Sequence, residues 1–185
     1  METKYISPGK PRVSGGIFRA PAGTTLPADA KTVLDNAFVN LGYVSEDGIS
    51  NSNIAEITEV YAWGGNSVMN SVNRKPDTWV FTLLEALSPN VLKTVYGDKN
   101  VTVSADGKSI NIMATADDAE EAVYAIDMAL SGGALKRIVI PKGVISNVAE
   151  IVYKDNSPIG YKITVNALYD ANGKSHYEHI QLAAE

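Results

Sequence analysis

Residues 77–97 carry two hydrophobic patterns in succession, the first typical of a strand and the second of a helix. Trp79, Phe81 and Leu83 occupy alternate positions, and aromatic residues at that spacing favour a β-strand. The side chains between them are also largely apolar, so we expect the strand to be covered on both faces. A short helix should follow, because Ser88 can serve as its N-cap and Gly97 can end it.

Period-two spacing predicts further strands along most of the chain. One of them begins at residue 43. The others fall at 16–20, 54–63, 67–74, 101–113, 138–140, 147–153, 161–169 and 175–182. Turn chemistry separates several of them: Gly64-Gly65, Asp106-Gly107 and Asn172-Gly173 each predict a hairpin, and 46–48 and 141–143 predict turns. The hairpin over 161–182 has the clearest pattern.

Residues 27–41 predict a helix of their own. Asp29 can act as its N-cap, apolar residues at 33, 34, 37, 38 and 41 recur at helical spacing, and Gly42 would end it.

The segment 117–130 fits two structures. A capping aspartate and apolar Val123, Ile126 and Leu130 favour a helix slightly, whereas alternation from Ala122 to Leu130 favours a strand.

These elements indicate a mainly β protein, a β-sandwich or partly closed barrel with one or two flanking helices. Residues 1–14 hold two prolines and no period, so we expect an extended N-terminal arm, followed by a single β-rich domain over 15–185. The length of 185 residues suits one domain with a substantial core.

Charge and composition exclude several classes of function. The net charge is −5, and acids gather in 21–72 and 117–130, so the basic footprint of a nucleic-acid-binding protein is missing. The chain has no cysteine, which excludes disulfides and thiolate metal sites. No apolar run approaches the ~20 residues of a membrane span.

Candidate chemistry yields no enzyme and no cofactor. His176 and His179 point to opposite faces of the predicted strand, which argues against a metal pair. Paired acids such as Asp117-Asp118 are typical of a solvated face. The aromatic pairs Tyr61/Trp63 and Trp79/Phe81 stand at strand spacing beside apolar neighbours, so we interpret them as core.

The order of several segments carries a family resemblance over nearly the whole chain. They include Gly-Gly-Ile-Phe-Arg-Ala-Pro at 15–21, Arg-Ile-Val-Ile-Pro-Lys-Gly at 137–143, and the stretches 22–27, 41–48, 62–65, 75–78, 84–87, 91–97 and 158–161. In this order they resemble the major tail proteins of long, flexible-tailed phages, especially those of Gram-positive hosts.

The resemblance implies a tail tube subunit in the phage virion, made in the host cytoplasm. Such proteins form hexameric rings of a β-sandwich flanked by a helix, and the rings stack into a hollow tube through which the genome passes. The implied partners are further copies of the chain, together with the tape measure, tail terminator and distal tail proteins. The resemblance also favours a strand for 122–130, and we follow it there.

Acidic side chains suit a conduit, because carboxylates repel phosphate and DNA should pass without specific binding. We expect Glu56, Glu59, Asp117 and Asp118 to face the lumen. The polar strand 67–74 suits a lumen-facing or inter-subunit position. The basic arm should dock on acidic surface of an adjacent ring, with these candidate contacts: Lys4, Lys10, Arg12, Glu46 and Asp47.

Two rival functions remain open. A β-sandwich carbohydrate-binding module or adhesin would use Tyr61, Trp63 or Trp79 as a binding platform. An enzyme would use the carboxylate clusters and would lose turnover in an Asp118→Asn variant.

Overall fold

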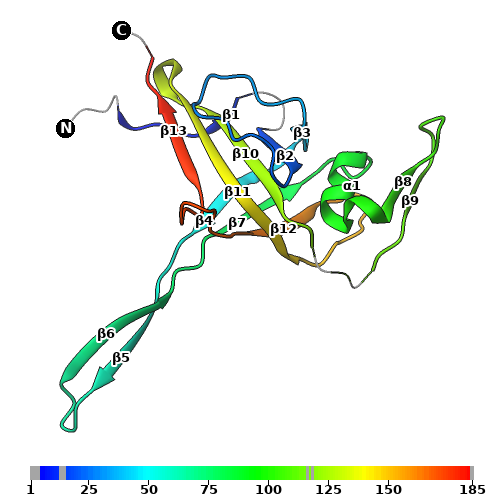
Figure 1. The fold of residues 1–185 in the computed structure, drawn as a ribbon. Coiled ribbons are helices and arrows are strands. Elements are labelled where there is room, and N and C mark those ends of the chain that lie inside the picture. Colours follow the sequence, from blue (N-terminus) through cyan, green and yellow to red (C-terminus); the bar gives the residue numbers. More distant parts are fainter. Residues whose placement is uncertain (1–4, 13–15, 116, 118, 184–185) are drawn as a thin grey trace.

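The computed structural model describes residues 5–12, 16–115, 117 and 119–183, and the fold is mainly β with one short helix (Figure 1). The strands are β1 (Lys10–Pro11), β2 (Ile17–Pro21), β3 (Val39–Asn40), β4 (Val44–Ser52), β5 (Glu56–Tyr61), β6 (Ser67–Arg74), β7 (Thr78–Leu83), β8 (Val101–Val103), β9 (Ile110–Ile112), β10 (Ala122–Ala129), β11 (Leu135–Val148), β12 (Tyr161–Ala167) and β13 (Tyr177–Gln181). The helix is α1 (Pro89–Tyr96), and η2 (Asp98–Asn100) and η3 (Ser131–Gly133) are 3-10 turns.

Nine of the strands form one antiparallel sheet in the order β3-β2-β10-β11-β12-β7-β4, with β1 paired to β10 and β13 paired to β11. The long strand β11 organises it, because β10 lies along one edge while β13 and β12 share the other. Two separate ribbons, β5–β6 and β8–β9, project from the sheet in different directions (Figure 1).

The sheet encloses one hydrophobic core. Strands from both of its ends contribute to it, for example Ile17 of β2 and Ile126 of β10 together with Phe81 of β7, and Leu92 of α1 packs on the same cluster. Because strands at opposite ends of the sheet face one core, the fold corresponds to the expected partly closed barrel with a flanking helix.

The strand and helix over 77–97 are confirmed. Trp79, Phe81 and Leu83 are buried on β7, whereas Val80 and its neighbours on the other face are only half-buried, so coverage of both faces was overestimated. Helix α1 has Pro89 in its first turn, and Gly97, with a φ of 95°, donates its N–H to the Lys93 carbonyl.

The helix predicted over 27–41 is wrong; the segment is a loop that leads into β3. Asp29 does cap locally, because its Oδ1 accepts the N–H groups of Lys31 and Thr32. The carbonyls of Asp29 and Thr32, however, accept hydrogen bonds from Nη1 of Arg137 at 3.0 and 2.7 Å. This long-range contact fixes the segment in a non-helical shape that sequence spacing could not reveal.

Arg137 is the largest fully buried side chain, and it joins three parts of the fold. Its Nε and Nη2 donate to both carboxylate oxygens of Asp127 at 2.6 and 2.7 Å, linking β11 to β10. Arg12, beside β1, lies 3.9 Å from the same carboxylate and donates to the Ala30 carbonyl. Asp127 therefore belongs to a buried ion pair and is not free to line a lumen.

One predicted turn and part of one predicted strand are corrected along β11. β11 runs without interruption from Leu135 to Val148, so 141–143 is not a turn and 149–153 is not a strand. The register shifts between Ala122 and Tyr124, opposite Gly143 and Ile140, and this bulge accommodates Pro141, which has no N–H to donate.

The predicted hairpin over 161–182 is also wrong. Asn172-Gly173 does form a turn, but β12 and β13 do not pair with each other, since each pairs with a different part of β11. Which strand a segment pairs with is a non-local property, and turn chemistry alone did not determine it.

The remaining elements agree more closely with expectation. Residues 122–129 form the strand β10, as the resemblance favoured, and β10 pairs with β2 and β11. The β5–β6 and β8–β9 hairpins are confirmed. The turn expected at 46–48 is instead an irregularity within β4, between the pairs Val44–Leu83 and Ile49–Phe81.

Replacing Arg137 by Met should destabilise the fold by about 3–5 kcal/mol, because the substitution leaves the Asp127 carboxylate buried without its partner. Urea unfolding followed by circular dichroism measures this. The neighbouring Lys136→Met variant is the control; it removes a half-exposed ion pair with Glu178 and should cost less than about 1 kcal/mol. Equal losses in the two variants would contradict the role given to Arg137.

Candidate functional site

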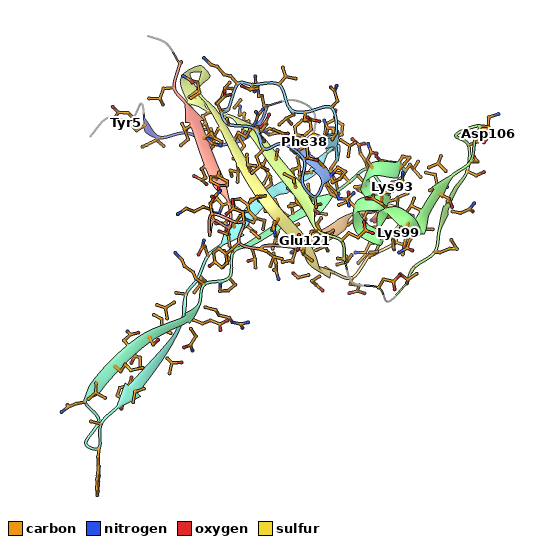
Figure 2. The ribbon with its side chains drawn as sticks, viewed as in Figure 1. Tyr5, Phe38, Lys93, Lys99, Asp106 and Glu121 are labelled. Atoms are coloured by element: carbon orange, nitrogen blue, oxygen red, sulfur yellow. The ribbon has the colours of Figure 1, made fainter. Side chains whose placement is uncertain are left out.

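The β5–β6 hairpin is the most exposed part of the described structure. It projects from the sheet between β4 and β7 (Figure 1), and its side chains stand in open space on both sides (Figure 2). Every residue of β5 is exposed, and within β6 only Ser71 is half-buried. A two-stranded ribbon of this kind is marginally stable in water by itself.

Apolar side chains lie on both faces of the hairpin. Ile57 is paired with Val72, and Val60 with Met69, and paired residues share a face. Successive residues of a strand face opposite ways. Ile57 and Val60 are three positions apart, so their pairs place apolar groups on opposite faces. Exposed apolar surface of this extent marks an interaction site.

The interpretation of the aromatic pairs as core is half right. Trp79 and Phe81 are buried, but Tyr61 is mostly exposed and Trp63, at the tip of the hairpin, is fully exposed. Strand spacing placed all four correctly on strands or beside them. It could not show that β5 and β6 leave the sheet.

A buried carboxylate holds the root of the hairpin. Asp77, just before β7, accepts hydrogen bonds from the Asn51 amide and the Ser175 hydroxyl, each at 2.7 Å, and lies 2.5 Å from Nδ1 of His176. His176 also meets the Trp79 ring edge-on. In a catalytic triad the histidine lies between the carboxylate and the nucleophile. Here Ser175 and His176 both contact the same oxygen of Asp77, so the cluster joins segments of the chain and is not a triad. We call this cluster the Asp77 clamp.

The described residues hold no group of three or more His, Asp or Glu side chains that could bind a metal ion. His176 is committed to Asp77, and His179 lies on β13 opposite Arg137 in the register.

The structure does not bring the three described lumen candidates together. Glu56 and Glu59 lie on the hairpin, whereas Asp117 lies in the loop between β9 and β10, where it accepts a hydrogen bond from Thr115 beside the end of α1. Asp118 lies outside the described residues.

The two hairpin acids differ in their electrostatics. Glu56 forms a 2.5 Å ion pair with Arg74, and that hydrogen bond lowers the pKa of Glu56. Glu59 accepts a hydrogen bond from the Tyr61 hydroxyl, which raises the pKa of Tyr61. Among the described residues no cation pairs with Glu59, so Glu59 keeps an uncompensated negative charge.

The candidate inter-ring contacts, by contrast, gather around one groove. This seam groove, of about 820 Å³, separates β4 from β1, β2 and β10 at the point where the sheet does not close. It is lined by Gly9, Pro11, Arg12, Gly16, Ile17, Tyr43, Val44, Ser45, Glu46, Gly48, Ile49, Ile126, Asp127 and Met128. Lys10 and Asp47 adjoin the lining residues, and Lys4 lies outside the described residues. The groove itself was not predicted, because it depends on how the sheet curves.

A family model described as phage tail tube protein matches residues 9–184. The chain belongs to the phage tail tube protein family. This tail tube protein is therefore a structural component of the virion tail that assembles with itself and with other tail components, and the expectation of a non-enzymatic protein is confirmed. No curated protein matches the chain. No helix in the described part of this tail tube protein is long and apolar enough to cross a membrane.

Removing the clamp should loosen the root of the hairpin. Asp77→Ala leaves the Ser175 hydroxyl without its acceptor and leaves the Asn51 amide only the Thr78 carbonyl, so we expect a loss of roughly 1–3 kcal/mol in the free energy of unfolding. Asp155→Ala, which removes an exposed carboxylate, is the control and should change it by less than about 0.5 kcal/mol. Urea unfolding of both variants measures the difference, and an unchanged Asp77→Ala midpoint would show that the cluster is dispensable.

Proposed function

We propose that this protein forms closed hexameric rings that stack into the tail tube of a long, flexible-tailed phage of a Gram-positive host, with DNA passing through the bore. The β5–β6 hairpin carries this proposal. Its apolar side chains on both faces need a partner, and in a self-assembling family a further copy of the chain supplies one.

Sheet edges support lateral closure of the ring. The large sheet ends in β3 and β4, and β4 pairs only with β7 among the described strands. An open edge of nine residues invites pairing with another chain, and a closed ring of subunits removes such edges. In the ring, β4 of each subunit meets its neighbour.

Contacts between rings then use the residues around the seam groove. Lys10 is exposed on β1, and Glu46 and Asp47 are exposed on β4, so the basic and acidic groups of one ring can meet those of the next. Arg12 is already engaged with Ala30 and Asp127, which anchors this part of the arm to its own subunit.

The bore carries a negative charge in this proposal. The net charge of −5 and the uncompensated Glu59 support it, and Asp117 and Asp118 are the other acids that we assign to the bore. Glu56 contributes less because Arg74 neutralises it. A negative wall repels phosphate, so DNA slides without specific binding. The tape measure, tail terminator and distal tail proteins complete the partners.

A carbohydrate-binding function is the alternative, because Tyr61 and Trp63 are exposed and could form a binding platform. Trp79 is buried and cannot form part of it. Quenching of Trp63 fluorescence by glycans, in protein that stays monomeric at high concentration, would favour that function over the tube.

The assembly itself is tested by negative-stain electron microscopy of concentrated protein. The wild type should form rings and tubes, whereas the double variant Val60→Asp/Met69→Asp should not, because it places two charges in one apolar face of the hairpin. Both side chains are exposed in the single subunit, so the circular dichroism spectrum and thermal midpoint should be unchanged.

The control for this experiment is the double variant Val33→Asp/Val152→Asp, which changes exposed apolar residues outside the hairpin and should still form tubes. Loss of tubes in both variants would remove the special role of the hairpin, and a wild type that stays monomeric would overturn the proposed function.

Charge reversal tests the bore. Tubes of Glu59→Lys/Asp117→Lys should retain short DNA at low salt, and added salt should release it, because new cations bind phosphate. The control variant Asp155→Lys/Glu150→Lys makes the same change in charge at two exposed acids elsewhere on the subunit. Its tubes should retain less DNA than those of Glu59→Lys/Asp117→Lys. Equal retention by the two sets of tubes, measured by co-sedimentation, would contradict the assignment of Glu59 and Asp117 to the bore.

A further inference from the structure

We infer that the tip of the β5–β6 hairpin, residues 62–66, inserts into the seam groove of another copy, with the indole of Trp63 filling the groove. This inference rests on the proposed function, since it names the surface that receives the hairpin when subunits assemble. Only the tip enters the groove, and the stem of the hairpin with Glu59 stays outside it.

The tip presents one large side chain on a narrow support. Its sequence is Ala-Trp-Gly-Gly-Asn, and Gly64 and Gly65 have φ angles of 109° and 88°, which favour glycine. The space around both glycines is empty, so Trp63 projects without neighbours of its own. Tryptophan, like tyrosine and arginine, is enriched among the hot-spot residues near the centres of protein interfaces.

The groove offers what such a side chain needs. Its wall includes Val44, Ile49, Ile126 and Met128, and its volume of about 820 Å³ exceeds that of one indole ring. Within it, the Asp127 carboxylate is paired with Arg137, and Arg12, 3.9 Å from that carboxylate, donates to the Ala30 carbonyl. The tip carries no charge, so its insertion buries no unpaired ion.

A polar atom of the groove is also missing its partner. The hydroxyl oxygen of Ser45, which lines the groove, is buried and makes no hydrogen bond within the described residues. A buried polar atom without a partner is costly. The indole N–H of Trp63 is a donor on an otherwise apolar ring, and it would satisfy this oxygen.

The placement of the two surfaces makes the contact intermolecular. The groove adjoins the first half of β4 (residues 44–49), whereas the hairpin leaves the far end of that strand after Ser52 and points away from β1 and β2 (Figure 1). A tip cannot fold back to its own groove. A head-to-tail contact of this kind uses two different surfaces and propagates from copy to copy.

Cysteine cross-linking tests the contact directly, because the natural chain has no cysteine. Asn66→Cys at the tip and Glu46→Cys at the groove rim are combined in one chain, assembled, and treated with a short bismaleimide. We expect a ladder of cross-linked species on denaturing gels. The pair Asn66→Cys/Asp155→Cys is the control and should stop at dimers or below.

Assembly energetics provide the second measurement. Trp63→Ala should raise the critical concentration for tube formation at least about tenfold, as expected for an interface hot spot. Trp63→Phe, which keeps an aromatic ring but loses the N–H, should lie between Trp63→Ala and the wild type. Trp63 is fully exposed in the single subunit, so these variants should fold normally.

The outcomes separate this inference from the proposed function. Tubes of the Asn66→Cys/Glu46→Cys chain that give no ladder, or a critical concentration of Trp63→Ala equal to that of the wild type, would overturn the groove contact while the tube stands. Absence of rings and tubes from the wild type would overturn both.

Discussion

The β5–β6 hairpin exposes apolar side chains that a single copy of the chain does not bury. A two-stranded ribbon bears apolar side chains on both faces, and the body of the subunit covers neither. Water is a poor environment for Ile57, Val60 and Met69, so the subunit is incomplete by itself. Because the family is one of self-assembling tail components, we propose that another copy of the chain is the missing partner.

The rest of the subunit supports that ribbon rigidly. The Asp77 carboxylate ties its root to Asn51 and to the segment before β13, and β7 anchors one of its strands in the core through Trp79 and Phe81. On the other side of the sheet, the buried pair of Arg137 and Asp127 fixes β10, β11 and the loop at 29–32. The seam groove lies between this part of the sheet and β4.

Local features could be predicted from the sequence, and long-range ones could not. β7 and α1 follow from alternation, a proline and a glycine within a few residues of each other. The helix expected at 27–41 failed because Arg137, far along the chain, captures two carbonyls of that segment. The final hairpin failed because β13 pairs with β11 and not with β12. For the same reason the inter-ring candidates were found as separate charges, and only the fold shows that Arg12 and Glu46 line one groove.

The most direct test of this account is amide hydrogen exchange of the β5–β6 hairpin in dilute and in assembled protein. The account predicts fast exchange for residues 56–74 in the monomer, where the ribbon is solvated on both faces, and strong protection in the assembled tube. The β10 and β11 amides should be protected in both states. Equal exchange of the hairpin before and after assembly would contradict the claim that another copy covers it.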